Sequence, residues 1–343
     1  MTSNFQTLDP KGDLTLNIAF PEEEIKLVSF LASSRHLSVA SPYFDRMFSG
    51  PWKESESVKS GSLDVSALPS CGPTSYSIIL NAMHGRFRKV PKSLPKAELL
   101  QVGKLVDYYE CLEVIEYQAE RWVDDAFKCD EPALEGGEMS AEWLFLSWIF
   151  PNSAIFGLVS KNWVRKAENA VDPGEYPTPQ VVTDAIDQRR KKIVSKVIER
   201  FEMAFDRLAS DQFDSQFPRP SFCRPEICPT LDCRLHMLGQ LARQLTELRV
   251  LPTFRGHVEG SFTSREQGYE GISYDGLFKI TNEFTKPSMC KRSTHYNGYG
   301  NTCDTIDFLK GIFSESSTKL SSLNLQALQS VNQRKTNSTN GKA

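Results

Sequence analysis

The sequence predicts a mixed α/β (α+β) domain over residues 12–130, followed by a mainly α-helical region over residues 141–320. Three patterns support this fold class. Apolar residues alternate along DLTLNIAF, as in a strand with one buried face. Short helical patterns and another strand pattern follow it. The segment TDAIDQRRKKIVSKVIERFEMAFDRLAS then repeats apolar residues with the period of a long amphipathic helix.

The N-terminal strands are predicted from this alternation and from turn residues. Residues 1–11 are expected to form a flexible arm before the first strand. A longer loop through FPEEE joins that strand to a second one, which runs from about Ile25 to Leu31, so the pair forms a hairpin. The segment GSLDVSAL alternates again and is expected to be a third strand.

Two short helices are predicted between the second and third strands. Ser33 or Ser34 fits the N-cap of the first helix and Ser41 fits that of the second, because a serine hydroxyl accepts a hydrogen bond from an otherwise unpaired amide. Pro42 suits the first helical position, where no N–H is needed. Gly50-Pro51 is expected to end the second helix.

The later helices are predicted from amphipathic repeats. SYSIILNAMHG, with Thr74 as its cap and Gly85 at its end, KAELLQVGKLVDYYE and LEVIEYQAERWVDDAF complete the first domain. Residues 131–140 are polar and form a linker. AEWLFLSWIF, SAIFGLVSKNWVRKA and LDCRLHMLGQLARQLTELRVL are helical, ISYDGLFKITNEF is helix or strand, and residues 321–343 are expected to be disordered.

Composition and charge exclude several classes of partner. The net charge is −3 with a pI near 6.0, so nucleic acid and anionic membranes are not expected to be main partners. No secretory signal and no apolar run of bilayer length is visible, which predicts an intracellular protein of the cytoplasm or nucleus. The basic run Arg189–Lys192 is either a solvated helix face or a nuclear-import or phosphate-binding patch.

No common catalytic or cofactor motif is present, so neither enzymatic activity nor a cofactor is expected. Cysteines and one histidine do recur within a short segment, and they leave two interpretations open. They are unliganded thiols beside a helix histidine, or they hold a structural zinc ion, although no pair has CxxC spacing. The residues concerned are Cys223, Cys228, Cys233 and His236, with Cys290, His295 and Cys303 further along the chain.

The segment LASSRHLSVASPYFDRMFSGPWKES resembles the central part of a BTB/POZ domain. The matching residues are Arg35-His36-Leu37, Ala40-Ser41-Pro42-Tyr43-Phe44 and Met47-Phe48. The order of predicted elements matches as well, over about residues 12–128, although an extra residue or two precedes His36. The second half of the chain is similar to the long helical region of many fungal BTB proteins.

The resemblance implies a protein–protein interaction module. BTB domains often form homodimers, and many are substrate adaptors for cullin-RING ubiquitin ligases. In the adaptors an apolar-x-Glu motif contacts the cullin, and Trp52-Lys53-Glu54 lies at that place here. The leading hypothesis is therefore an adaptor, and the alternatives are a homo-oligomeric scaffold or, from a different class, a metal-dependent enzyme built around Cys223 to Cys303. The expected partner-binding residues are Tyr43, Phe44, Met47, Phe48, Trp52 and Glu54.

Overall fold

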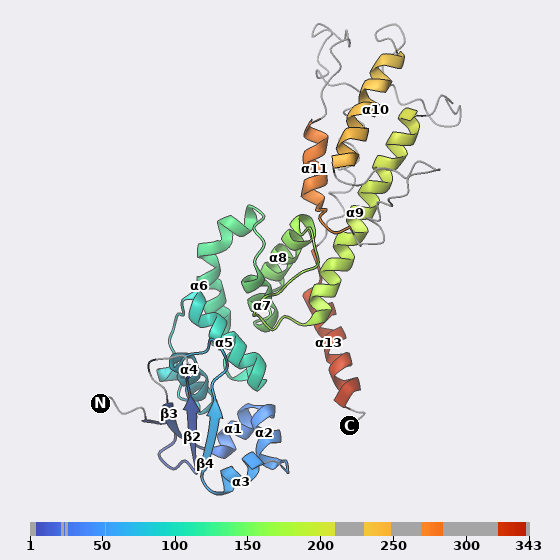
Figure 1. Cartoon of the computed structure of the whole chain (residues 1–343). Coiled ribbons are helices and arrows are strands. Elements are labelled where there is room, and N and C mark those ends of the chain that lie inside the picture. Colours follow the sequence, from blue (N-terminus) through green and yellow to red (C-terminus); the bar gives the residue numbers. More distant parts are fainter. Residues whose placement is uncertain are drawn as a thin grey trace. The chain divides into compact units, whose positions relative to one another are not determined.

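The computed structural model (Figure 1) describes residues 5–21, 24, 27–51, 53–209, 230–247, 269–283 and 322–340. The chain divides into two compact units. The first comprises residues 1–159, 173–179 and 325–333, and the second comprises residues 160–172, 180–324 and 334–343.

A four-stranded sheet lies at the start of the first unit, with the strand order β1-β3-β2-β4. Strand β2 (Leu14–Ala19) pairs antiparallel with β3 (Leu27–Ala32), which confirms the expected hairpin. Strand β4 (Ser62–Ser66) runs parallel to β2 on its other side. The alternating leucine and isoleucine side chains of β2 are buried, so the sheet has one apolar face against the helices, as the alternation predicts.

Strand β1 (Phe5–Thr7) corrects the prediction of a flexible arm over residues 1–11. It pairs in parallel with β3, and the amide of Leu8 donates to the carbonyl of Leu31 at 2.9 Å. The outer edge of β3 would otherwise present unpaired backbone groups, which the short segment covers. The buried side chain of Leu8 fastens the end of β1 to the domain.

Helices α1 (Ser34–Ala40) and α2 (Pro42–Ser49) begin at the expected caps. The Ser33 hydroxyl accepts from the His36 amide, and the Ser41 hydroxyl accepts from the Phe44 amide at 3.1 Å. Helix α2 ends before Gly50 as predicted. Helix α3 (Lys53–Lys59) was not expected, because its sequence KESESVK has no apolar stripe.

The next helices follow their amphipathic patterns. Helix α4 (Pro73–Met83) starts one residue before Thr74, with Gly72 as its N-cap and Pro73 at its first position, where no N–H is needed, so Thr74 is not the cap. Gly85 has a φ of +67° just beyond the helix, as expected for its C-terminal turn. The 3₁₀ segments η1 (Phe87–Lys89) and η2 (Leu112–Val114) flank α5 (Lys96–Tyr109).

The predicted linker at 131–140 is helical over its first half, because α6 (Glu116–Glu135) continues through it. Pro132 lies within the helix, and Leu134 is buried and holds the last turn. The polar composition of this segment gave no sign of the helix, because Leu134 is its only buried apolar side chain.

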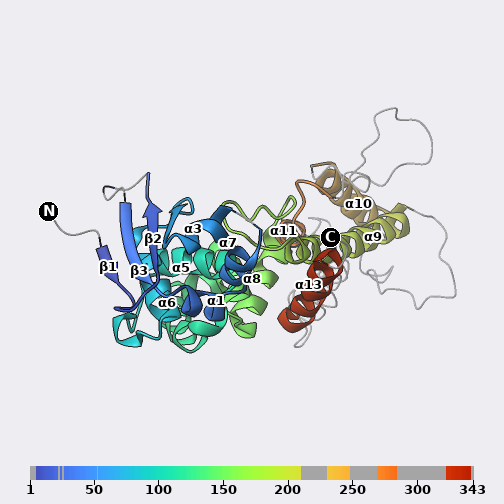
Figure 2. The same ribbon diagram turned by 90° about the horizontal axis from the view of Figure 1, so that it is seen from below.

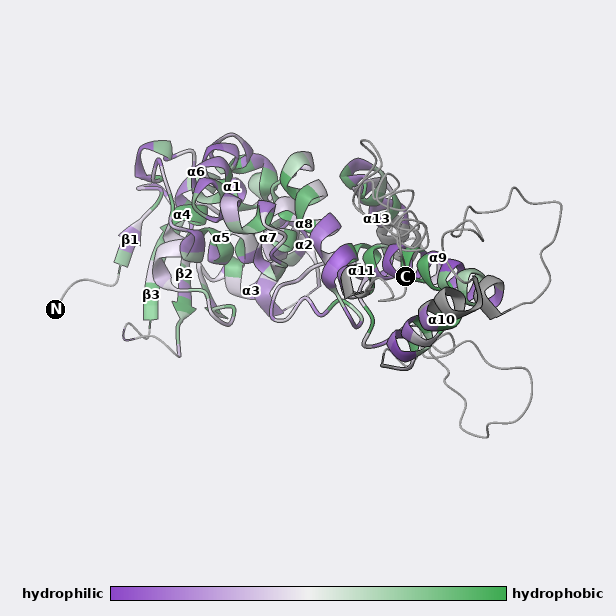
Figure 3. Ribbon diagram, turned by 90° about the horizontal axis from the view of Figure 1, so that it is seen from above, coloured by the Kyte–Doolittle hydropathy of each residue, from purple (hydrophilic) through white to green (hydrophobic). Residues whose placement is uncertain are grey.

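Helix α7 (Ala141–Ile149) belongs to the first unit, which therefore extends well beyond residue 130. Lys96 on α5 contacts both Asp130 of α6 and Glu142 of α7 at 2.7 Å, and the indole N–H of Trp143 donates to the same Asp130. Figure 3 shows hydrophobic residues along α7 and along α8 (Ser153–Lys166). The apolar segment AEWLFLSWIF completes the core of the first unit.

The second unit is built around α9 (Gln180–Ala209), the longest helix predicted from the sequence. Helix α10 (Thr230–Glu247) packs on α9, and both views in Figures 1 and 2 show the two side by side. The segment that was predicted as helix or strand is helix α11 (Tyr274–Glu283). The side chains of α9 at Val194, Val197 and Phe201 are buried, as the apolar repeat predicts.

Two further features differ from expectation. Residues 321–343, predicted to be disordered, contain α13 (Leu325–Asn340), whose first side chain is buried. Arg190, part of the basic run interpreted as a solvated helix face or as a nuclear-import or phosphate-binding patch, is only 1% exposed. Its guanidinium donates to the carbonyls of Glu168, Tyr269 and Ile272 at 3.1–3.3 Å, so buried carbonyls replace water around the charge.

Candidate functional site

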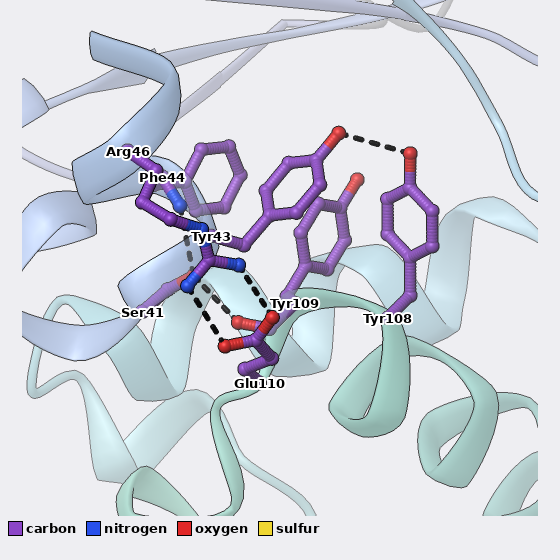
Figure 4. Close-up of polar contacts among 7 residues, drawn as sticks. All are labelled: Ser41, Tyr43, Phe44, Arg46, Tyr108, Tyr109 and Glu110. Carbon is purple, nitrogen blue, oxygen red and sulfur yellow. Dashed lines mark hydrogen bonds and ion pairs between the residues drawn. The ribbon is translucent and has the colours of Figure 1, made fainter. Parts of the chain in front are cut away.

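Four of the six expected partner-binding residues, Tyr43, Phe44, Met47 and Phe48, lie on α2. Ser41 fixes the position of that helix. The Ser41 side chain is fully buried. Its hydroxyl donates to the carbonyl of Tyr109 at 2.6 Å and accepts from the amide of Phe44. One side chain therefore caps α2 and joins it to the last turn of α5 (Figure 4).

The buried ring of Phe44 packs α2 against the end of α5. It is 1% exposed, and its ring stacks on that of Tyr109 with 4.8 Å between centroids and 11° between planes. The sequence placed Phe44 among the partner-binding residues. Its burial corrects that assignment, because a core side chain holds α2 in place and leaves no surface for a partner.

Tyr43 lies at the centre of the contacts that join α2 to the end of α5. Its hydroxyl lies 2.9 Å from that of Tyr108 on α5, and the two rings are 4.9 Å apart (Figure 4). Burial raises the pKa of Tyr43, and the hydrogen bond with Tyr108 and the nearby charge of Glu54 raise it further. Tyr43 is therefore a neutral hydroxyl at physiological pH, held in one orientation, with Glu54 close to it.

An ion pair lies beside the two tyrosines. Both terminal nitrogens of the Arg46 guanidinium contact the carboxylate of Glu110, Nη1 at 3.1 Å. Glu110 follows α5 with left-handed backbone geometry at φ 52°, which turns its side chain toward α2. The pair is exposed, so it adds little to stability and serves to fix the orientation of two polar groups.

Asp107 adds an unusual carboxyl group on α5. Burial raises its pKa to about 6, and the charge of Glu110 contributes in the same direction. The Asp107 carboxyl group is therefore protonated in mild acid.

We call the set Tyr43, Arg46, Met47, Tyr108 and Glu110 the α2–α5 surface. Arg46, Tyr108 and Glu110 are exposed, and Tyr43 is half-buried. Met47 and Phe48 are half-buried, and the ring of Phe48 lies 5.5 Å from that of Phe44. Glu54 is exposed in the first turn of α3, next to this surface. Trp52 lies outside the described residues.

The sequence did not point to Tyr108, Tyr109 or Glu110. They are 64 to 68 positions away from their partners on α2, and α5 was assigned from its apolar stripe alone. The pair Tyr108-Tyr109 at the end of an amphipathic helix was the available signal, because Tyr109 continues the apolar stripe and Tyr108, rotated by about 100° on the helix, does not.

The proposed zinc ligands are not brought together by the described part of the chain. Cys223 and Cys228 lie outside it, as do Cys290, His295 and Cys303, and Cys233 is on α10 without a described side chain. His236 is exposed and contacts Gln240 one turn later on α10. Within the described residues, no group of three or more His, Cys, Asp or Glu side chains could hold a metal ion.

The described helices also include none whose length and apolar character would let it cross a bilayer. No model of a known protein family matches the sequence, and no curated protein is significantly similar to it.

Proposed function

We propose that this chain is a protein-interaction protein, that its N-terminal part is a BTB-type domain, and that the α2–α5 surface with Trp52 and Glu54 binds a cullin scaffold. The observation that carries the proposal is the pair formed by the half-buried Tyr43 and the exposed Tyr108, held together by their hydroxyl groups at 2.9 Å. Tyrosines fixed in this way are typical anchors of protein interfaces.

The order of elements supports the fold part of the proposal. A β2–β3 hairpin leads into α1 and α2, and β4 then returns parallel to β2. The BTB resemblance implies the same order of strands and helices. Fold alone does not determine function, so the binding role depends on the surface itself.

Preorganisation makes this surface suitable for binding. The ion pair between Arg46 and Glu110 and the hydroxyl contact of Tyr43 each join α2 to α5. Side chains that are already ordered lose less conformational entropy when a partner binds. Glu54 adds an exposed negative charge near Tyr43, which a basic or hydrogen-bond-donating group of a scaffold would meet.

The test is a binding titration of the full chain against the N-terminal domain of a BTB-binding cullin. We expect micromolar or tighter binding that weakens at least tenfold in Trp52→Ala, Tyr43→Ala and Glu54→Ala. Glu56→Ala is the matched control, because Glu56 is exposed on the same helix. Circular dichroism and light scattering show whether each variant is folded. Absence of binding by the folded wild-type chain would exclude a cullin as the partner.

A homo-oligomeric scaffold is the second candidate, and Val39 favours it. This valine on α1 is 83% exposed, so its apolar side chain is accessible to a second copy of the chain. If the chain assembles through α1, light scattering will give a multiple of the monomer mass that Val39→Glu reduces to the monomer. Glu54→Ala would leave that mass unchanged, so the two candidates are separable.

A further inference from the structure

His84 joins the end of α4 to the start of α1. Its Nδ1 lies 2.8 Å from the carbonyl oxygen of Leu80, and its Nε2 lies 3.0 Å from the backbone amide of Ser33. A carbonyl only accepts and a backbone amide only donates, so Nδ1 carries the proton and Nε2 has a lone pair. The imidazole is therefore the neutral form with both nitrogens engaged.

Ser33, whose amide donates to His84, is the N-cap of α1. The Ser33 hydroxyl accepts from the amide of His36 in the first turn. The next residue, Ser34, donates from its amide and its hydroxyl to the carboxylate of Asp13, at 2.8 and 2.6 Å. The junction between β3 and α1 is thus held by two side chains from other parts of the fold, His84 and Asp13.

We propose that the His84–Ser33 contact is a pH-sensitive latch, which holds the start of α1 when His84 is neutral and releases it when His84 is protonated. A second proton would sit on Nε2 and turn the acceptor into a donor, facing the amide of Ser33. Two N–H groups at 3.0 Å repel each other, so the amide would have to move away.

His36 increases the effect of acid. Its exposed ring stacks on that of His84, with 5.5 Å between centroids and 29° between planes. Protonation of His84 places a positive charge beside this ring, and His36 opposes that charge. The start of α1, which carries His36, is the part that can move to separate them.

The charged groups around His84 determine how acidic the solution must become. Burial lowers the pKa of His84, and His36 and Arg86 lower it further. The carbonyl of Leu80 and the more distant carboxylate of Asp9 act in the opposite direction. The latch therefore opens below the ordinary histidine range of about 6.5. Asp13 accepts hydrogen bonds from Ser34 and does not contact the His84 ring. Its contact with the start of α1 therefore remains in mild acid.

The latch is a property of the fold and does not depend on cullin binding. Its consequence concerns the surface of α1, where Val39 is exposed. Loosening the first turn would change how α1 presents this side chain to another molecule. Acid would then weaken any contact made through α1.

The test follows the Ser33 amide and the His84 ring in the full chain by NMR between pH 7.5 and 5.0. We expect the hydrogen-exchange protection factor of Ser33, corrected for intrinsic exchange, to fall about tenfold as His84 titrates, since one hydrogen bond is lost. In His84→Gln the side-chain amide oxygen still accepts from Ser33 but does not titrate, so protection should stay constant.

His36→Gln is the second variant, and it leaves the latch itself intact. Removing the neighbouring charge should move the transition of His84 to higher pH without removing it. The proposal is overturned if Ser33 keeps its protection while His84 titrates, or if His84→Gln loses protection over the same pH range as the wild type.

Discussion

The ring of Phe44 lies nearly parallel to that of Tyr109, so the first turn of α2 and the last turn of α5 share one buried aromatic contact. This buried contact positions the residues of the α2–α5 surface. Tyr43 and Tyr108 are the chain neighbours of the stacked pair, and their hydroxyl contact depends on the spacing that the stack sets.

Replacing Phe44 with alanine should destabilise the whole first unit. A buried phenylalanine removed from a packed core costs about 3–5 kcal/mol, because apolar contacts are lost and a cavity remains. Chemical denaturation of the full chain measures this change. Phe48→Ala is the control, and its effect should be clearly smaller because Phe48 is only half-buried. Equal losses in both variants would mean that the Phe44–Tyr109 stack has no special role.

Ser41→Ala should cost about 2 kcal/mol of unfolding free energy. The substitution removes the N-cap of α2 and leaves the buried carbonyl of Tyr109 without its hydrogen-bond donor. Ser49 is the last residue of α2, and Ser49→Ala removes only its exposed hydrogen bond to the Asp45 carbonyl. This variant should change the free energy of unfolding by about 0.5 kcal/mol at most. A similar small effect at Ser41 would contradict the bridging role given to its hydroxyl.

Arg190 should be essential to the second unit. Arg190→Met keeps much of the apolar stem but leaves the carbonyls of Glu168, Tyr269 and Ile272 without this donor, at an expected cost of about 3 kcal/mol. Thermal denaturation and hydrogen exchange of residues 160–172 would report the loss. Lys191→Met alters the exposed neighbour and should be nearly neutral. If Arg190→Met were equally neutral, the carbonyls would have to find other donors.

The ionised Asp107 carboxylate should lower the free energy of unfolding at neutral pH. Its pKa of about 6 in the folded chain exceeds the ordinary value of 3.8, so the folded state binds the proton more tightly. This contribution is fully present below about pH 4 and disappears as the pH rises through 6. Asp107→Asn should therefore stabilise the chain at pH 7.5 and not at pH 4, by about 1 kcal/mol, since partial exposure reduces the full effect.

Denaturation midpoints at the two pH values test this directly. The exposed Glu113, changed to Gln, is the control for a general effect of removing a negative charge. A gain at pH 7.5 from both variants would point to net charge rather than to the burial of Asp107.

Local patterns in the sequence predicted the elements that carry their own signal. The alternation of Leu14, Leu16 and Ile18 fixed the buried face of β2, and the serine caps fixed the starts of α1 and α2. Such signals act over a few residues and survive without tertiary information.

The remaining features depend on contacts between distant segments. Strand β1 is three residues long and exists because β3 offers an edge. The run at Arg189–Lys192 looks like a solvated face until the carbonyls around Arg190 are in place. Candidate residues on α2 were found by resemblance, but the α5 half of the surface lies more than 60 positions away and has no motif. Sequence periodicity cannot pair such segments.

The close approach of α5 and α7 gives the last prediction. A Cβ atom on Gly103 would lie 3.1 Å from the ring of Phe145 and 3.4 Å from Ile149, so this glycine lets α7 pack against α5. Gly103→Val should cost about 2 kcal/mol or more, because the branched side chain forces the two helices apart. Gly239→Ala on α10 meets nothing within 4 Å and should instead stabilise its helix by up to about 1 kcal/mol. Denaturation of both variants measures the contrast. If Gly103→Val left stability unchanged, the close approach of α5 and α7 at Gly103 would not limit the size of the side chain there.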